Sequence, residues 1–458
     1  MGIELSAING LSRRTFLAGL ALSVSAASAI AQGAAPVTLF QNVRIFEGKS
    51  ASLTEPMNVL VRGNRIEKIS KAPVPTDRSA NTRIIAGGGR TLMPGLIDAH
   101  AHMAMSTIPI ALLMTADSNY SMLRQAKAAS DMLMRGFTSA RDLGGPTFGL
   151  KRAIDEDFVA GPRIWPAGTT ISQTSGHGDF RTIQEIPRGS ADPLHFTERQ
   201  GFTAVADGVP EVLRRTRENL MRGASHIKIM AGGGVSSNYD PLDVAQYTEA
   251  EFRAAVDAAT DWGTYVTVHA YTPAAMQKAI RAGVKCIDHG QLADEGTVKL
   301  MAEKGIWWSM QPFLDDEDAI PFPEGSPNRR KQLQMSAGTD NAYKLAKKYG
   351  VKLAWGTDTL FDAKLASRQN AQLAKMVRWF TPAEVLTMAT RTNGELLDLS
   401  GLRNPYPGKI GVVEEGALAD LLLVDGDPIA DIKLIEDPAK NFLVIMKDGK
   451  IYKNAIVS

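Results

Sequence analysis

The chain is organised around the stretch Leu92-Met93-Pro94-Gly95-Leu96-Ile97-Asp98-Ala99-His100-Ala101-His102. It is an apolar run that ends in two histidines at positions i and i+2, and on a β-strand this spacing places both side chains on one face. Two imidazoles on one face at the carboxyl end of a strand can begin a metal site. An isolated His-x-His is more often a pair of ordinary surface or core histidines, so the remaining ligands must be sought elsewhere in the chain.

The composition narrows the class of protein. The chain has 458 residues, of which 44% are hydrophobic and 22% charged, enough for a large catalytic domain and a smaller one. Its net charge of +2 comes from 51 basic and 49 acidic residues, so we expect no nucleic-acid partner and no polybasic membrane patch. The single cysteine, Cys286, excludes a disulfide within the chain.

Residues 1–31 differ from the rest of the chain. Ser12-Arg13-Arg14-Thr15-Phe16-Leu17 precedes a short segment rich in Ala and Ser, and Ala29-Ile30-Ala31 supplies a small-x-small cleavage site. These features predict a signal peptide of the twin-arginine type, hence export to the periplasm with no stable membrane anchor after cleavage. An uncleaved N-terminal anchor is the alternative, although the apolar segment is short for a membrane span.

Strand-like segments lie at both ends of the chain. Residues 37–46 and 58–69 read as strands with turns, and the same texture returns between residues 419 and 452. Neither end alone can bury an apolar face. We therefore predict one small β-sandwich domain composed of residues 36–91 and 401–458.

The middle of the chain, residues 92–400, alternates apolar strands with amphipathic helices, which is typical of a parallel α/β sheet. Eight strands are expected, in the opening stretch and at residues 137–142, 163–168, 226–230, 265–270, 286–289, 306–310 and 352–358. Helices are expected at residues 118–135, 209–223, 248–261, 273–282, 294–304 and 335–349. Eight such units predict a (β/α)8 TIM-like barrel. A doubly wound sheet is the alternative, but it usually has fewer strands and a Gly-rich phosphate turn, which the sequence lacks.

Two connections are unusually long. Residues 173–208 follow the third predicted strand, and residues 314–335 follow the seventh. In a barrel both would lie at the mouth formed by the carboxyl ends of the strands, where they would act as lids or specificity walls. Ordinary insertions are the alternative.

Ionisable residues recur at the ends of the predicted strands. Four of the seven histidines fall there, together with a lysine and an aspartate: His100, His102, Lys228, His269, His289 and Asp358. A neutral imidazole offers one lone pair to a divalent ion, and a carboxylate adds charge compensation. Three or four such ligands with an open position predict a catalytic site of the zinc type.

Lys228 is the informative member of this set. It lies in the apolar run Ile227-Lys228-Ile229-Met230 and should point into the protein, where an isolated ammonium is costly. Burial and nearby cations lower the pKa of such a lysine and favour the neutral amine, which can add CO2 to form a carbamate whose two oxygens bridge two metals. A lysine that reaches solvent or pairs with an acid is the alternative.

Taken together, these motifs resemble the amidohydrolase superfamily. Within it the chain is similar to the imidazolonepropionase-related, prolidase-like branch of binuclear Xaa-Pro and Xaa-Arg/Lys dipeptidases and ochratoxin-hydrolysing amidohydrolases. Imidazolonepropionase itself and cytosine deaminases are less similar, because they are mononuclear and lack the bridging lysine. The likeness runs from about residue 36 to the end and rests on Pro94-Gly95-Leu96-Ile97-Asp98-Ala99-His100-Ala101-His102, His226-Ile227-Lys228-Ile229-Met230-Ala231-Gly232-Gly233-Gly234, Val268-His269-Ala270-Tyr271, Asp288-His289-Gly290, Gly356-Thr357-Asp358, Thr381-Pro382-Ala383-Glu384-Val385-Leu386 and Gly416-Ala417-Leu418-Ala419-Asp420-Leu421.

The resemblance implies a site with two divalent metal ions, zinc being expected and manganese or cobalt being alternatives. His100, His102 and Asp358 would bind the more buried ion, His269 and His289 the more exposed one, and carboxylated Lys228 (N6-carboxylysine) and a hydroxide would bridge them. The hydroxide would attack the scissile carbonyl, and Asp358 would pass its proton to the leaving amine.

Two further residues are expected to contact the substrate. His177 lies in Ser175-Gly176-His177-Gly178-Asp179, where Ser175 replaces a glycine of the family's Gly-Gly-His-Gly segment, and Tyr271 follows His269 by two residues as in the peptidase branch. The implied reaction releases a C-terminal amino acid from a dipeptide or an N-acyl amino acid, including ochratoxin-like N-acyl-phenylalanines. The resemblance also implies a homo-oligomer.

Two alternatives to this predicted function remain open. The same site would also suit a cyclic amide, a lactone or an organophosphate ester. A binding protein built on an inactive barrel is an alternative from a different class.

The other candidate residues are weaker. We expect His226 to be structural, His195 to be a solvated loop residue, and Cys286 and the tryptophans Trp307, Trp308 and Trp355 to lie in the core. Arg329 and Arg330, or Arg181 and Arg188, could bind a substrate carboxylate, and the sequence does not choose between the two pairs.

Overall fold

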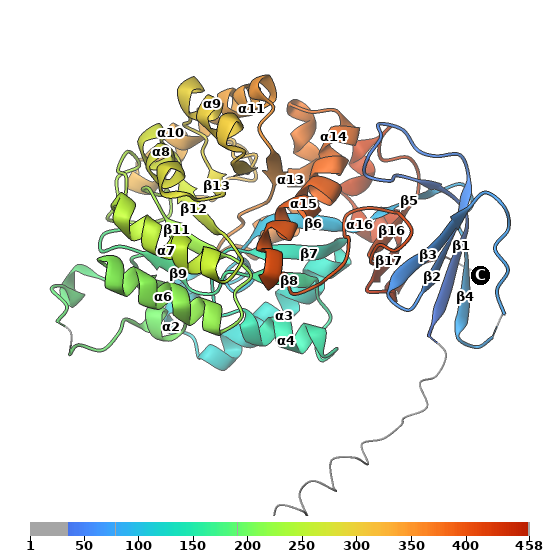
Figure 1. Ribbon diagram of the computed structural model, residues 1–458, viewed down its shortest axis with the longest axis horizontal. Coiled ribbons are helices and arrows are strands. Elements are labelled where there is room, and N and C mark those ends of the chain that lie inside the picture. Colours follow the sequence, from blue (N-terminus) through green and yellow to red (C-terminus); the bar gives the residue numbers. More distant parts are fainter. Residues whose placement is uncertain (1–34, 78, 190, 457–458) are drawn as a thin grey trace, which may run out of the picture.

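The computed structural model describes residues 35–77, 79–189 and 191–456. The predicted signal peptide lies outside the described residues. Within the described part of the chain, no helix combines the length and the apolar character needed to cross a membrane. Figure 1 shows a strand-rich part on one side and a larger part, in which helices surround parallel strands, on the other.

Strands from both ends of the chain share one eight-stranded sheet. Its order is β18-β17-β16-β5-β1-β2-β3, with β4 paired to β1. The N-terminal members are β1 (Val37–Ile45), β2 (Met57–Arg62), β3 (Arg65–Ser70), β4 (Thr82–Ala86) and β5 (Thr91–Pro94), and the C-terminal members are β16 (Leu421–Val424), β17 (Phe442–Lys447) and β18 (Lys450–Asn454). The expected pairing of the two terminal segments takes place between β5 and β16, which run antiparallel.

The larger part contains two parallel sheets. One has the order β6-β7-β8 and the other β10-β9-β11-β12-β13-β14-β15. All eight strands expected from the sequence are present, as β6 (Leu96–Ala101), β7 (Phe137–Asp142), β8 (Arg163–Pro166), β11 (Ile227–Met230), β12 (Val266–Ala270), β13 (Cys286–His289), β14 (Trp307–Met310) and β15 (Leu353–Trp355). Two short strands were not expected, β9 (Thr170–Ser172) and β10 (Thr203–Val205).

Hydrogen bonds join both edge strands of the three-stranded sheet, β6 and β8, to the seven-stranded sheet. The Ser225 amide, just before β11, donates to Pro166 O at the end of β8 (2.8 Å), and the Asp358 amide, just after β15, donates to His100 O in β6 (2.8 Å). The carboxyl ends of β6 and β15 therefore lie side by side, and this brings residues about 250 positions apart in the sequence into one site.

The opening stretch is divided between two sheets. It was expected to form one strand, but β5 pairs in the terminal sheet and β6 in the parallel one, with Gly95 between them. The Gly95 amide donates to Asp420 O (2.8 Å), and the Leu96 amide donates to Gly136 O (3.0 Å). A Cβ on Gly95 would lie 2.1 Å from Thr138 Oγ1, so this crossing requires glycine.

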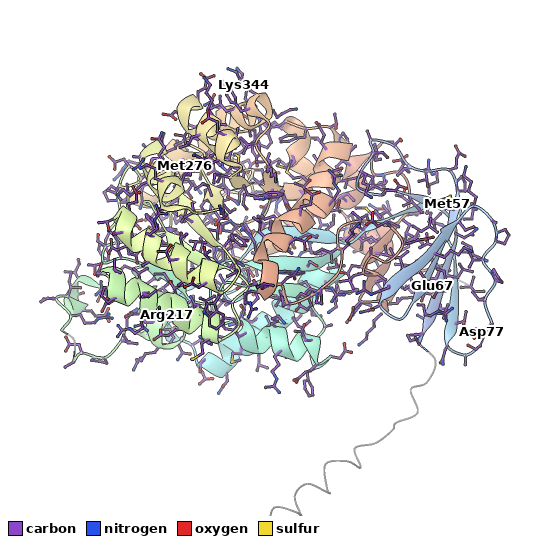
Figure 2. All side chains as sticks on the ribbon, viewed as in Figure 1. Met57, Glu67, Asp77, Arg217, Met276 and Lys344 are labelled. Atoms are coloured by element: carbon purple, nitrogen blue, oxygen red, sulfur yellow. The ribbon has the colours of Figure 1, made fainter. Side chains whose placement is uncertain are left out.

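Five of the six expected helices are present, as α3 (Ser118–Met134), α6 (Val209–Met221), α7 (Glu249–Asp261), α8 (Pro273–Ala282) and α9 (Glu295–Lys304). Thr248 and Glu251 form the capping box that starts α7. The helices are amphipathic: Figure 2 shows Arg217 of α6 at the outer surface, whereas Met276 of α8 is fully buried. The shorter helices are α2 (Ile110–Thr115), α4 (Phe148–Asp155), α5 (Phe196–Arg199), α12 (Ala363–Ser367), α13 (Gln369–Ala374), α14 (Pro382–Thr387), α15 (Asn393–Leu397) and α16 (Pro438–Asn441).

The expectation of one helix over residues 335–349 was wrong. The structure has α10 (Pro327–Ser336) and α11 (Thr339–Tyr349), with a break at Gly338. A Cβ on Gly338 would lie 2.1 Å from Gln291 O. The chain therefore turns where its backbone packs closely against the loop after β13.

Candidate metal centre and substrate pocket

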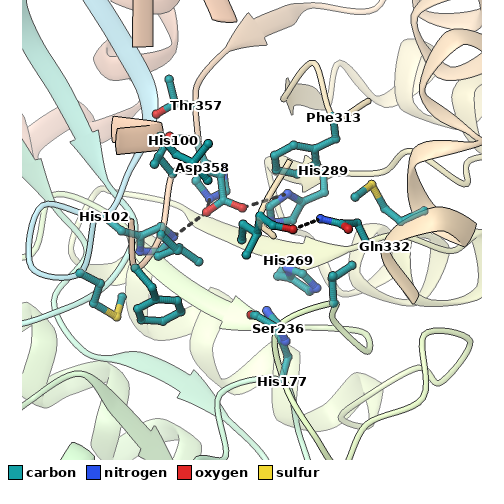
Figure 3. Close-up of a pocket in the computed structure, with 18 of the residues that line it drawn as sticks. His100, His102, His177, Ser236, His269, His289, Phe313, Gln332, Thr357 and Asp358 are labelled. Carbon is teal, nitrogen blue, oxygen red and sulfur yellow. Dashed lines mark hydrogen bonds and ion pairs between the residues drawn. The ribbon is translucent and has the colours of Figure 1, made fainter. Parts of the chain in front are cut away.

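The six ionisable residues expected at strand ends line one pocket. Figure 3 shows His100, His102, His269, His289 and Asp358 converging on it, with His177 on the far side of His269. His100 lies in β6, His269 in β12 and His289 at the end of β13. His102 directly follows β6, and Asp358 is the third residue after β15. Because parallel strands end at the same edge, this topology collects the side chains without any sequence proximity.

The distances and the bonding of these side chains suit a cation. Asp358 Oδ1 lies 3.3 Å from His100 Nε2 and 3.1 Å from His102 Nε2. His100, His289 and Asp358 each place one ligand atom within 4.8 Å of the others. Both His100 Nε2 and His102 Nδ1 are buried without a hydrogen-bond partner, and an orphaned buried nitrogen is costly unless another group binds it.

Hydrogen bonds select which ring nitrogen remains available on the other two histidines. His269 Nε2 lies 3.1 Å from Gly233 O, and His289 Nδ1 lies 2.7 Å from Gln311 Oε1. This leaves Nδ1 of His269 and Nε2 of His289 for a metal. Fixing one nitrogen in this way orients the ring and sets its tautomer, as is usual for histidines that bind metals.

The backbone at two of these positions is strained. His289 has φ 76° and Asp358 has φ 49°, values that non-glycine residues seldom adopt. Asp98 supports the second of them, because its buried carboxylate accepts hydrogen bonds from the His100 amide (2.9 Å) and from Thr357 Oγ1 (2.7 Å). Asp98 thus ties the end of β6 to the turn after β15, a role that the sequence pattern did not reveal.

Lys228 is 1% exposed and makes an ion pair with Asp288, 2.6 Å from Nζ to Oδ2. Of the two alternatives kept for this lysine, reaching solvent is wrong, and pairing with an acid is what the structure contains. Arg141 of β7, also buried, donates to the other oxygen of Asp288 (2.5 Å) and to Ala99 O (2.6 Å). Sequence reasoning missed both Arg141 and Asp288, although each is a charged residue within an apolar strand.

The local electrostatics keep the candidate ligands in the protonation states that bind metal. Burial lowers the pKa of His100 to about 4 and lowers the pKa values of His269 and His289 well below 6.5. Burial alone would raise the pKa of Asp358, but the imidazoles that face its carboxylate, His100 foremost, outweigh burial, and the pKa lies well below its usual range. His100, His269 and His289 are therefore neutral and the Asp358 carboxylate is ionised at pH 7.

The metal-free protein is expected to lose stability as the pH falls from about 6.5 towards 4. The unfolded chain then protonates histidines that stay neutral when folded, among them His100 and the buried His226, so each contributes a loss of about 1.4 kcal/mol per pH unit until its folded pKa is reached. Urea unfolding of chelator-treated protein between about pH 7 and pH 5 measures this. A free energy of unfolding that is constant over that range would contradict it.

His177 and Tyr271 both line the pocket beside His269. The His177 ring stacks on the His269 ring, with 4.1 Å between centroids and 23° between planes. The Tyr271 ring lies 4.9 Å from His269 and 5.2 Å from His289, and its side chain is buried. The structure thus places both predicted substrate contacts against the candidate metal ligands.

The pocket walls are mostly apolar. Both long connections contribute to them, residues 173–208 through Phe180 and Phe202 and residues 314–335 through Ile320 and Met335, as expected of specificity walls. Other apolar lining residues, which sequence reasoning did not single out, are Met105, Met230, Val235, Phe313, Leu360, Phe361 and Leu365. Among the described residues of the lining, Lys228 is the only lysine, and there is no arginine.

The four loop arginines that could bind a substrate carboxylate, Arg181, Arg188, Arg329 and Arg330, are not among the residues that line the pocket. Each guanidinium instead finds an acceptor close to it in sequence: Asp179 Oδ2 for Arg181 (2.6 Å), Glu198 for Arg188, Asp315 Oδ1 for Arg329 (2.7 Å) and Gly325 O for Arg330. Local ion pairs thus hold the loops together and leave these arginines unavailable to a ligand in the pocket.

The remaining candidates are structural. His226 is buried and stacks on Tyr265, and Cys286, Trp307, Trp308 and Trp355 are buried, as expected. The expectation of a solvated His195 was wrong: its side chain is 9% exposed, and its Nδ1 accepts from the Thr197 amide (3.3 Å) to cap α5. A histidine before a short helix gives no sequence signal of such a cap.

Comparisons with known proteins place the chain among metal-dependent hydrolases. The model of the Amidohydrolase family matches residues 91–452. An ochratoxinase of Aspergillus niger is 32% identical over 383 residues, which cover 79% of this chain and 75% of that protein. A solved amidohydrolase structure superposes with a TM-score of 0.83 at 33% identity (92% of this chain, 100% of the other), and a prolidase complexed with N-methylphosphonate-L-proline with a TM-score of 0.81 at 32% identity (91% and 100%).

Proposed function

The chain belongs to the amidohydrolase family and acts as a hydrolase on amide bonds, and we propose that it releases an amino acid from an N-acyl amino acid or a dipeptide at a site with two metal ions. The observation that carries the proposal is the convergence of His100, His102, Lys228, His269, His289 and Asp358 on one apolar pocket. Zinc suits this donor set best, and manganese or cobalt is the alternative.

The proposed ligand groups follow the ends of the strands. His100, His102 and Asp358 would hold one ion, and His269 and His289 would hold the other. Lys228, carboxylated on Nζ, would bind both ions. Two divalent ions at such a site acidify a water molecule and polarise a carbonyl group. Arg141 would balance the negative charge that carboxylation adds beside Asp288, since it already pairs with that residue.

The proposed chemistry assigns three roles to protein groups. The Asp358 carboxylate takes the proton of the attacking water and delivers it to the leaving nitrogen, so that an amine departs rather than an amide anion. His177 and Tyr271, which flank His269, contact the carbonyl oxygen or the carboxylate of the substrate.

We also propose that the two parallel sheets form one (β/α)8 barrel, which begins at β6 rather than at residue 92 because β5 belongs to the terminal sheet, and that the terminal sheet folds on itself as a β-sandwich. The barrel is supported by the hydrogen bonds that join β6 and β8 to the seven-stranded sheet, and the sandwich by buried residues contributed from both chain ends, such as Val43, Ile66, Leu421 and Val444. Export to the periplasm by the twin-arginine route and a homo-oligomeric state are further proposals, which rest on the sequence alone.

The apolar lining favours substrates with aromatic or aliphatic groups on both sides of the amide. A cationic side chain would meet phenylalanines and methionines, and the lining residues Asp316 and Asp318 are already paired with Lys375. We therefore expect N-acyl-phenylalanines and apolar dipeptides to be hydrolysed roughly tenfold or more faster, in kcat/KM, than Xaa-Arg or Xaa-Lys dipeptides.

A panel of these amides assayed beside a lactone, a cyclic amide and an organophosphate ester tests the proposal, with release of a free amino acid as the readout. If the lactone, the cyclic amide or the organophosphate ester is turned over fastest, the substrate belongs to that alternative class and not to the amino-acid amides.

A further inference from the structure

The polar contacts of the His177 ring come from a single loop. Its Nδ1 lies 2.7 Å from Ser237 Oγ and 3.5 Å from Asp240 Oδ2, both in the loop after β11. Within the described part of the chain, every hydrogen bond of the ring runs through Nδ1. Nε2 is therefore the nitrogen left for a ligand in the pocket.

The partners of Nδ1 fix where the ring proton lies. The Asp240 carboxylate accepts only, and the Ser237 hydroxyl donates to Gly234 O (3.3 Å), so that its lone pairs are free to accept. Both groups therefore favour a proton on Nδ1. A carboxylate on one imidazole nitrogen, with the other directed at the reacting group, is the arrangement by which an aspartate orients a catalytic histidine.

Asp240 is a fully buried carboxylate with incomplete hydrogen bonding. Its Oδ2 accepts from the Gly234 amide (2.7 Å), but its Oδ1 has no hydrogen-bond partner and lies 4.0 Å from Lys331 Nζ. Burying an ionised group this way is costly, and packing alone does not require it. Its position 3.5 Å from His177 Nδ1 indicates that the buried charge orients the His177 ring.

The loop that carries Asp240 is anchored from outside. Lys331 of α10 donates to Ser237 O (2.7 Å) and Asp240 O (3.2 Å), and Asn328 of the same helix donates to Val235 O (2.7 Å). The long connection after β14 thus holds the loop after β11 in place, and that loop in turn orients His177.

The loop is also shaped to the ring. A Cβ on Gly234 would lie 1.8 Å from His177 Nδ1. Gly234 does not have a positive φ, so its backbone conformation does not require glycine. The close approach of the imidazole does.

We propose that Asp240, together with Ser237, is a positioning residue that holds His177 with its Nδ1 proton directed at the loop and its Nε2 directed at the substrate. The role of His177 in turnover rests on the proposed function, whereas the orientation of its ring does not.

A double-mutant cycle on the metal-loaded protein tests the proposal. Asp240→Asn is expected to lower kcat by on the order of 10- to 100-fold with little change in KM or metal content. In a His177→Ala background the same substitution should change kcat less than about threefold. Equal losses in both backgrounds, or no loss in either, would overturn the positioning role.

Two controls accompany the cycle. Asp420→Asn removes another buried carboxylate, one that pairs with Arg163 and is not among the residues that line the pocket, and it should leave kcat within about threefold. If Asp240→Asn folds poorly, Ser237→Ala is a milder test of the same proposal. The loss of kcat that Ser237→Ala causes should likewise disappear in a His177→Ala background.

A spectroscopic readout keeps the proposal separate from the proposed function. In the histidine ¹⁵N spectrum of the metal-loaded protein, His177, identified by its loss in His177→Ala, should show a protonated Nδ1, and Asp240→Asn should shift that signal. An unprotonated Nδ1, or a signal that Asp240→Asn leaves unchanged, would refute the proposal even if no amide is hydrolysed.

Discussion

Replacing Lys228 with methionine is expected to abolish amide hydrolysis, with a loss of kcat of roughly 10³-fold or more, and to lower the metal content of the purified protein. Methionine keeps the length of the apolar stem but has no amine to carboxylate. Since Arg141 still pairs with Asp288, the buried carboxylate keeps a counterion, and we expect the variant to fold.

The control for this substitution is Lys278→Met, which removes a lysine of α8 whose Nζ donates to Tyr247 O away from the pocket. It should retain both activity and metal. Addition of a short carboxylic acid should restore part of the activity of Lys228→Ala, where a cavity is left beside the metal ligands. A Lys228→Met protein with wild-type kcat would rule out the bridging carbamate.

Replacing Asp358 with asparagine is expected to lower kcat by about 10²- to 10⁴-fold, because the amide cannot take a proton from the attacking water. The same change removes the negative charge that faces His100 Nε2 and His102 Nε2, so weaker metal binding should accompany the loss. Activity measured with saturating metal separates the two effects, and the loss of proton transfer should persist.

Asp316→Asn is the matched control, since Asp316 lines the same pocket but pairs with Lys375. It should change kcat less than about threefold. A comparable loss in both variants would indicate a general effect of charge in the pocket and would remove Asp358 from the proposed proton transfer.

Much of this arrangement could be read from the sequence because it depends on position along strands. Parallel strands buried on both faces appear as apolar runs, and ligands near their carboxyl ends appear as polar residues that follow those runs, as Asp358 follows Leu353-Ala354-Trp355. The strand ends therefore predicted which side chains would meet, before any distance was known.

Pairings between strands could not be read in this way. Nothing in the local pattern of β7 or β13 indicates that Arg141 reaches Asp288, 147 positions away, or that Asp288 takes Lys228 as its second partner. The sequence could not assign a role to the arginines of the long loops for a related reason, since it does not show whether a guanidinium already has a neighbour such as Asp179 as its partner. The break at Gly338 likewise depends on a distant backbone, that of Gln291.

We propose that one chain holds two metal ions on His100, His102, Lys228, His269, His289 and Asp358 and hydrolyses amides with them. The metal content per chain of purified, active protein, followed during chelation and reloading with Zn²⁺, tests this proposal. We expect two equivalents of divalent metal, loss of amide hydrolysis as they are removed and recovery as both return. Full amide hydrolysis with one equivalent or none would contradict it.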